Sequence, residues 1–192
     1  MKNLFLIFLS ATLCLSVKAQ VKDTIGLNLP IVNGTIMHEG IVDVPGKTKN
    51  QLFASAKTFL LETFVSAKAV IETEDKEDGV LNCKGIHQVV LKLNFMYDGS
   101  FNDEMIIQIN CKDGKYRYRF YDFRLSPTGF VGNTPNNWPS ATYMDLLNDL
   151  TGTGKTHYTK KQEIYLLTDN EKAVKELVAR LNKKMAAKED SF

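Results

Sequence analysis

Residues 105–120 of the 192-residue chain have the sequence MIIQINCKDGKYRYRF. Every second residue in the first half of this stretch is apolar, and such alternation predicts a strand with one buried face. The residues concerned are Met105, Ile107, Ile109 and Cys111. Asp113 and Gly114 then form a dipeptide typical of a tight hairpin turn. We therefore expect a second strand over 116–125 that pairs with the first.

Three further strands are expected upstream. Residues 36–44 alternate, with His38 and Val42 on one side, and Pro45 ends them. Residues 67–73 and 80–93 also alternate around a polar turn, so we expect them to form a hairpin. A Gly-containing break at 97–102 then precedes the strand at 105–111, and this turn would place Cys111 opposite about Val89.

Two stretches have helical periodicity. Apolar residues recur at three- and four-residue spacing over 49–65, which predicts a first helix. Thr168 and Glu171 have the spacing of a capping box, so we expect a last helix over 169–187. Cationic side chains complement the C-terminal dipole of that helix, namely Lys183, Lys184 and Lys188.

Residues 126–161 form an irregular excursion. Its three prolines and four glycines predict that little of it joins a sheet. A short helix is expected at 142–150, a mobile stretch at 151–161 and a short strand at 163–167. Apolar residues such as Phe130 and Trp138 are numerous enough for part of the excursion to dock on the sheet or on a partner.

These elements predict an α+β fold. The order is β-α-β-β-β-β-α, and a mostly antiparallel sheet of about five strands would bury one face beneath both helices. The other face would remain open to water or to a partner. One domain over 36–188 accounts for the chain that follows a leader at 20–35.

The N-terminus has the features of a secretory signal peptide over 1–19. A charged start is followed by a short apolar run, and small residues lie at Val17 and Ala19, so we expect cleavage after Ala19. A retained anchor is the alternative, but Lys18 interrupts a run shorter than the roughly 20 residues needed to span a bilayer. We expect an exported protein, periplasmic or extracellular, with no transmembrane segment after cleavage.

Charge and cysteine content limit the partners. The chain has 24 basic and 22 acidic residues, and removing Lys2 and Lys18 leaves 22 of each, so nucleic acid is not an expected partner. Cys83 and Cys111 remain after cleavage. The expected register holds them about 20 Å apart, which favours two buried free thiols over a disulfide, although a bulge could alter the register.

Three stretches carry the resemblance to a known family: 42–46 leading into the first helix, 79–85 in the hairpin, and 112–120 around its Asp-Gly turn. In these the chain resembles the domain of unknown function found in exported Bacteroidetes proteins, which has a TATA-binding-protein-like (TBP-like) fold. The resemblance implies a fold and an address outside the cytoplasm. It implies no activity and no catalytic residue.

Apparent catalytic motifs have simpler explanations. The stretch TGTGKT at 151–156 lacks the first glycine of a phosphate loop, because Asp149 stands at that position. The acidic run at 72–78 does not fill the ligand positions of a calcium loop. The three histidines have no ligand spacing. We therefore assign no catalytic, cofactor-binding or metal-binding residue, and expect no cofactor.

The function favoured by these observations is a non-catalytic binding or structural module of the cell envelope, with an unknown envelope protein or glycan as partner. The candidate binding surface combines the open sheet face with the excursion, and consists of Arg117, Arg119, Tyr121, Phe130 and Trp138. The alternative is a hydrolase of envelope glycan or peptide, which would need two converging carboxyl groups. Oligomeric state is not indicated.

Overall fold

The computed structural model describes residues 26–64 and 70–187. Its main sheet has the strand order β10-β7-β6-β5-β4, and β3 also pairs with β7. All pairings are antiparallel. The strands are β3 (His38–Asp43), β4 (Val70–Asp75), β5 (Val80–Lys92), β6 (Asp98–Lys112), β7 (Lys115–Thr128) and β10 (Ala141–Thr142). Two small hairpins lie outside this sheet. One pairs β1 (Ile31–Val32) with β2 (Thr35–Ile36), and the other pairs β8 (Phe130–Val131) with β9 (Thr134–Pro135).

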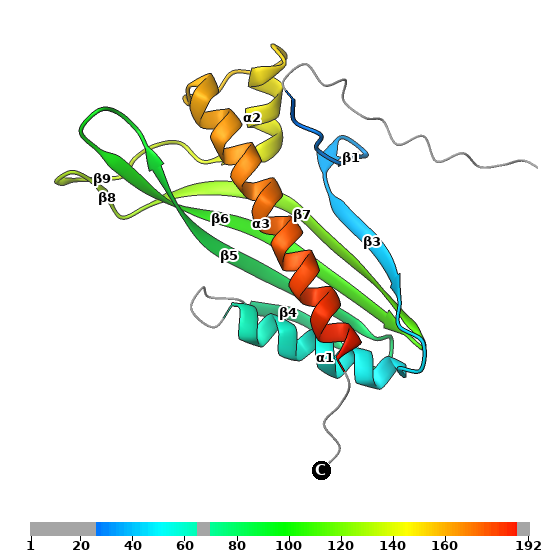
Figure 1. The fold of residues 1–192 in the computed structure, drawn as a ribbon. Coiled ribbons are helices and arrows are strands. Elements are labelled where there is room, and N and C mark those ends of the chain that lie inside the picture. Colours follow the sequence, from blue (N-terminus) through cyan, green and yellow to red (C-terminus); the bar gives the residue numbers. More distant parts are fainter. Residues whose placement is uncertain (1–25, 65–69, 188–192) are drawn as a thin grey trace, which may run out of the picture.

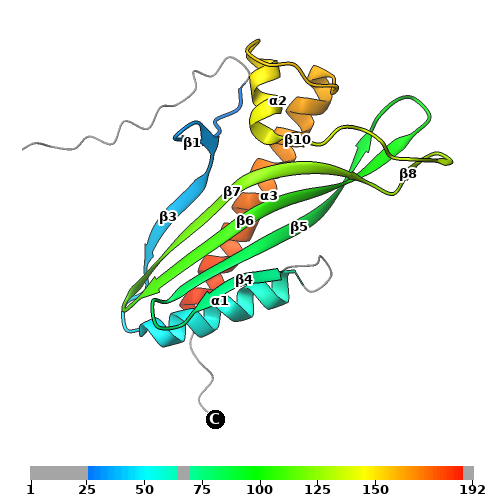
Figure 2. The same cartoon turned by 180° about the vertical axis from the view of Figure 1, so that it is seen from behind.

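The helices are α1 (Lys49–Thr63), α2 (Tyr143–Leu150) and α3 (Lys160–Ala186). Figure 1 shows α3 lying across one face of the sheet with α1 beside its C-terminal end, and Figure 2 shows β5, β6 and β7 from behind with no helix over them. The expected α+β class with an antiparallel sheet is thus confirmed, and the described residues contain the short helix α2 besides the two helices counted in the expected element order. No helix in the described ranges is both long and apolar enough to cross a membrane.

A bulge in β7 keeps its apolar side chains on the helix-covered face. Tyr116 and Phe120 are buried before it, and Phe123 and Leu125 after it, so the buried positions shift from even to odd numbers. Between them the β6–β7 register shifts, and Asp122 has a φ of 54°. Because one extra residue reverses which face a side chain occupies, the bulge lets both halves of the long strand contribute to one core.

The β5–β6 turn lies earlier than the sequence predicted. Leu93 and Tyr97 close it, and the Asn94 side chain accepts backbone hydrogen bonds from Met96 and Tyr97, each 2.9 Å long. The expected register is therefore wrong: Cys111 lies beside Gly79, and Cys83 pairs with Ile107. The expectation of two buried free thiols is nevertheless confirmed.

The last helix begins earlier than predicted. Thr159 is its N-cap, and Gln162 completes the capping box. The predicted box of Thr168 and Glu171 is wrong, because Thr168 lies within α3 and donates its hydroxyl proton to the carbonyl of Ile164. The strand expected at 163–167 is wrong for the same reason, since these residues are helical. The first helix begins at Lys49 as predicted, and its expected end at Val65 lies outside the described residues.

The excursion is more ordered than its composition indicated. Strand β7 continues through Pro127, which lies opposite Phe101, and β10 pairs with β7, so part of 126–161 does join the sheet. The short helix expected at 142–150 is present as α2. Within the leader, Leu29 packs into the core. The signal peptide, the first leader residues, strand positions 67–69 and Lys188 lie outside the described residues.

Candidate functional site

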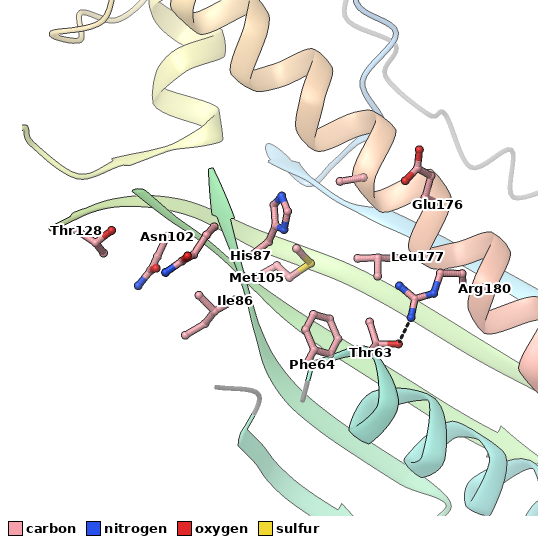
Figure 3. A pocket seen from close by; sticks show the side chains of 12 residues that line it. Thr63, Phe64, Ile86, His87, Asn102, Met105, Thr128, Glu176, Leu177 and Arg180 are labelled. Atoms are coloured by element: carbon pink, nitrogen blue, oxygen red, sulfur yellow. Dashed lines mark hydrogen bonds between the residues drawn. The ribbon is translucent and has the colours of Figure 1, made fainter. Parts of the chain in front are cut away.

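A cleft of about 690 Å³ opens between the end of α1, strands β5 and β6, and α3. Figure 3 shows its lining side chains, which come from the end of α1, from β5 and β6, and from the middle of α3. The protein therefore brings together segments from both ends of the chain at one edge of its sheet.

The floor of the cleft is apolar. Phe64 and Met105 are buried, and Leu177 of α3 is half-buried above them. Gly85 permits this arrangement, because a Cβ atom there would lie 3.1 Å from the Phe64 ring and 3.1 Å from a methyl of Ile107. A side chain at position 85 would thus displace the ring that forms the floor.

The rim of the cleft is polar and exposed. His87 and Gln88 lie on β5, and Glu176 and Arg180 lie one helical turn apart on α3. The Arg180 guanidinium donates a hydrogen bond to the Thr63 hydroxyl over 3.2 Å, which connects α3 to the end of α1 (Figure 3). An apolar floor with a few polar groups at its margin is the usual composition of a binding site.

One edge of β5 faces no described strand along this cleft. Strand β4 pairs with β5 only as far as Val70 and Lys84, whereas β5 continues to Lys92. Over 85–92, β5 therefore pairs with β6 on one side and with no strand of the described chain on the other. The carbonyl group of Lys92, at the end of this stretch, accepts a hydrogen bond from the Gln162 side chain over 2.8 Å. The rest of such an edge presents amide and carbonyl groups that can pair with another chain.

The carboxyl groups with raised pKa values are not among the residues that line this cleft, although Asp103 is the cross-strand partner of the lining residue His87. Burial raises the pKa of Asp103 to about 7, and this side chain lies beneath α3 beside Asn170. Burial also raises the pKa of Glu163, at the N-terminal end of α3. Among the described lining residues Glu176 is the one carboxyl group. The described residues contain no group of three or more His, Cys, Asp or Glu arranged to hold a metal ion.

The five residues of the predicted binding surface lie in three separate places, namely the helix-free sheet face, the β8–β9 hairpin and the margin of the core beside Tyr158. Arg117, Arg119 and Tyr121 alternate along β7 with the buried Tyr116 and Phe120, which places the first three on the helix-free face. Arg119 is already engaged there, donating to Glu39 over 3.2 Å and to Gln108 over 3.4 Å.

Phe130 and Trp138 do not join that face. Phe130 lies on the β8–β9 hairpin and is 64% exposed. Trp138 packs against the core, with its ring 5.3 Å from that of Tyr158. The five residues thus form no continuous surface.

The cleft residues were not identified from the sequence. Glu176 and Arg180 belong to a charged helix that gives no local indication of a site. One usable observation was the unequal length of the predicted hairpin arms, 67–73 against 80–93, since the longer arm must continue past its partner.

Comparisons with known proteins agree with this fold. Residues 38–126 match the family model described as a domain of unknown function (DUF4468) with TBP-like fold. A crystal structure of a TBP-like protein from Parabacteroides distasonis superimposes with a TM-score of 0.64 at 15% identity, covering 84% of this chain and 99% of that one. A crystal structure of a DUF4468 family protein from Bacteroides ovatus gives a TM-score of 0.63 at 13% identity, covering 90% and 100%.

The expected resemblance and the TBP-like fold are thereby confirmed. A search of curated proteins gave no significant match. The matched stretch runs from β3 into β7, whereas the superpositions cover 84% or more of the chain.

Proposed function

We propose, from the match of residues 38–126 to the DUF4468 family model and from the geometry of the cleft, that the protein is a non-catalytic binding module that captures an extended peptide segment along the edge of β5 that faces no described strand. The observation that carries the proposal is the row of backbone groups over 85–92 that faces no strand in the described chain. We further propose that the protein acts after export, with a segment of another envelope protein as its partner.

Strand addition suits this edge because the main chain supplies the affinity. A peptide laid beside 85–92 would extend over about 26 Å, at about 3.3 Å per residue. Its backbone would pair with β5 while alternate side chains pointed to opposite faces of the sheet. The side chains on the helix-covered face would enter the cleft above Phe64 and Met105.

The lining predicts which peptides are preferred. An apolar side chain should occupy the floor, because Leu177 and Phe64 present apolar surface there. Neighbouring peptide residues would meet Glu176 and Arg180, so side chains able to pair with one or both charges should be favoured. A hydrolase would need two carboxyl groups facing the same cleft. Glu176 is the one carboxyl-bearing residue of the described lining, which favours binding over hydrolysis.

The test is selection of binders from a random peptide display library against the chain that starts at Gln20. Selected peptides should slow the hydrogen exchange of β5 amides within 85–92 more than that of β7 amides. Leu177→Asp should weaken binding roughly 10-fold or more, because it places a charge on the apolar floor.

Val178→Asp is the matched control. Val178 is the next residue of α3 and is also half-buried, but it lines a separate pocket beside β3. Binding that Val178→Asp weakens as much as Leu177→Asp, or peptides that protect β7 instead of β5, would contradict the proposal. Failure to select any peptide would also count against it.

A further inference from the structure

A second surface lies at the far end of the same sheet. The β5–β6 turn there exposes 93% of Phe95 and 73% of Met96. The turn has a defined shape, since Leu93 donates to the carbonyl of Tyr97 over 3.1 Å and the Asn94 side chain accepts from Met96 and Tyr97. A large aromatic ring and a flexible thioether are thus held in water at the tip of a projecting hairpin (Figure 1).

Two other elements extend this apolar surface. The Tyr97 ring lies against Gly132 of the β8–β9 turn, where a Cβ atom would lie 2.7 Å from it, so the two hairpins touch. The β8–β9 hairpin adds Phe130, which is 64% exposed. Tyr165 of α3 borders a groove of about 600 Å³ together with Phe95. We call these five residues the distal patch: Phe95, Met96, Tyr97, Phe130 and Tyr165.

Cations accompany the distal patch. Lys92 and Lys161 line the same groove as Phe95, and Lys160 is exposed beside them, whereas Asp98 is the one described acidic residue of that lining. Glu163 follows closely in sequence, but its side chain is buried. Aromatic and apolar side chains bordered by lysines match the chemistry of a bilayer interface, where rings enter the headgroup layer and ammonium groups meet phosphates.

We propose that the distal patch docks the protein on the surface of an anionic phospholipid bilayer. Phe95 and Met96 enter the headgroup layer, while Lys92 and Lys161 pair with lipid phosphates. A bilayer suits the geometry better than a folded partner does. The most exposed part of the distal patch, Phe95 and Met96 at the tip of the turn, is small beside the roughly 800 Å² that each side of a stable protein interface buries, whereas a headgroup layer accepts a few projecting apolar side chains bordered by lysines. Neither Phe95 nor Met96 lines the cleft beside α1, and Lys92 is the residue that the bilayer site shares with the proposed peptide-binding edge, so the Phe95→Ser, Met96→Ser variant tests bilayer docking separately from peptide capture.

The test is co-sedimentation of the chain starting at Gln20 with vesicles. Vesicles of phosphatidylcholine mixed with phosphatidylglycerol should bind it more strongly than vesicles of phosphatidylcholine alone. The paired substitution Phe95→Ser with Met96→Ser should weaken binding roughly 10-fold or more, because it removes the inserted apolar groups. Lys92→Glu with Lys161→Glu should remove the preference for phosphatidylglycerol, and added salt should reduce that preference in the unaltered protein.

Ile41→Ser is the matched control, because Ile41 is 70% exposed on β3, away from the distal patch. It should bind vesicles as the unaltered protein does. Thermal unfolding should be unchanged in both serine variants, since the replaced side chains are exposed.

Three results would overturn the proposal. One is no binding to the phosphatidylglycerol vesicles, and another is equal binding by the Phe95→Ser, Met96→Ser variant. The third is a dimer of the unaltered protein, detected by light scattering, together with a monomeric Phe95→Ser, Met96→Ser variant that still binds vesicles. That result would assign the distal patch to contacts with a second copy of the chain.

Discussion

Asp103 of β6 and Asn170 of α3 meet beneath the helix, where the Asn170 amide donates a hydrogen bond to one carboxyl oxygen of Asp103 over 3.2 Å. Both side chains are almost completely buried. The other oxygen of Asp103 has no hydrogen-bond partner in the described protein. Burial therefore raises the pKa of Asp103 to about 7, although hydrogen bonds from Asn170 and Tyr143 oppose the shift.

The raised pKa of Asp103 predicts a loss of stability as the pH rises. Between pH 3.8 and about 7 the folded protein keeps a proton on this carboxyl that the unfolded chain has released. The free energy of unfolding must therefore fall across that window, by on the order of 4 kcal/mol for a shift of about three pKa units. Asp103→Asn should abolish most of this fall in urea unfolding measured from pH 4 to pH 8.

Glu104→Gln is the control for that measurement. Glu104 is the next residue of β6 and faces the helix-free side, where it pairs with Lys84 over 2.7 Å. Its replacement should leave the fall between pH 4 and pH 7 in place. A fall that persists in Asp103→Asn would show that another group is responsible.

Gly40 and Tyr118 form a second close pair. They are cross-strand partners, and a Cβ atom at residue 40 would lie 2.6 Å from the Tyr118 hydroxyl oxygen. Gly40→Ala should therefore lower the free energy of unfolding by about 1–3 kcal/mol, as overpacking does. In a Tyr118→Leu background the same change should cost clearly less, since the ring is gone. An equal cost in both backgrounds, measured by urea unfolding, would refute the contact as the cause.

Trp138 should matter for stability. Its ring packs on Tyr158, whose hydroxyl donates to the carbonyl of Pro139 over 3.0 Å. Trp138→Ala should cost about 2 kcal/mol of unfolding free energy, below the range for a fully buried ring. Phe130→Ala should cost almost nothing, because Phe130 is 64% exposed. Equal stability of the two variants would contradict this placement of the tryptophan.

Much of the fold follows from local patterns in the sequence. Alternation predicted β5, β6 and β7, and the Asp113–Gly114 dipeptide predicted the turn between β6 and β7. The periodicity after Thr48 predicted α1. Each of these patterns depends on a few neighbouring residues. Burial of one face then determines which side of the sheet the helices cover.

Where two local patterns competed, the sequence did not identify the correct one. Thr159 with Gln162 and Thr168 with Glu171 both have capping-box spacing, and the burial of Leu166 and Leu167 favours the first. Gly99 was interpreted as part of a turn, yet it lies within β6, where a Cβ atom would come 2.5 Å from Leu93. The cleft was unpredictable for a related reason, because it depends on how α3 and the end of α1 lie over β5 and β6.

The segment between α2 and α3 was expected to move independently of the core. Its contacts divide it into an exposed first part and a following residue that is held by hydrogen bonds. Residues 151–155 are exposed, but Thr156 is fixed at two points. Its amide donates to the Asp149 carboxylate over 2.6 Å, and its hydroxyl donates to Glu163. We therefore expect trypsin to cleave after Lys155 before it cleaves after Lys160 or Lys161, which lie in the first turn of α3.

Glu163→Ala tests this anchoring. The loss of a hydrogen bond to a buried carboxyl group costs about 1.5–3 kcal/mol, so local opening near Thr156 should become roughly 10-fold or more frequent. Hydrogen exchange of the Thr156 amide and tryptic cleavage after Lys155 should both accelerate accordingly. Ile164→Ala is the control, because Ile164 adjoins Glu163 on α3 and is 38% exposed. If Glu163→Ala and Ile164→Ala are cleaved at the same rate, Glu163 does not anchor the segment, and independent motion over the whole of 151–161 becomes the better description.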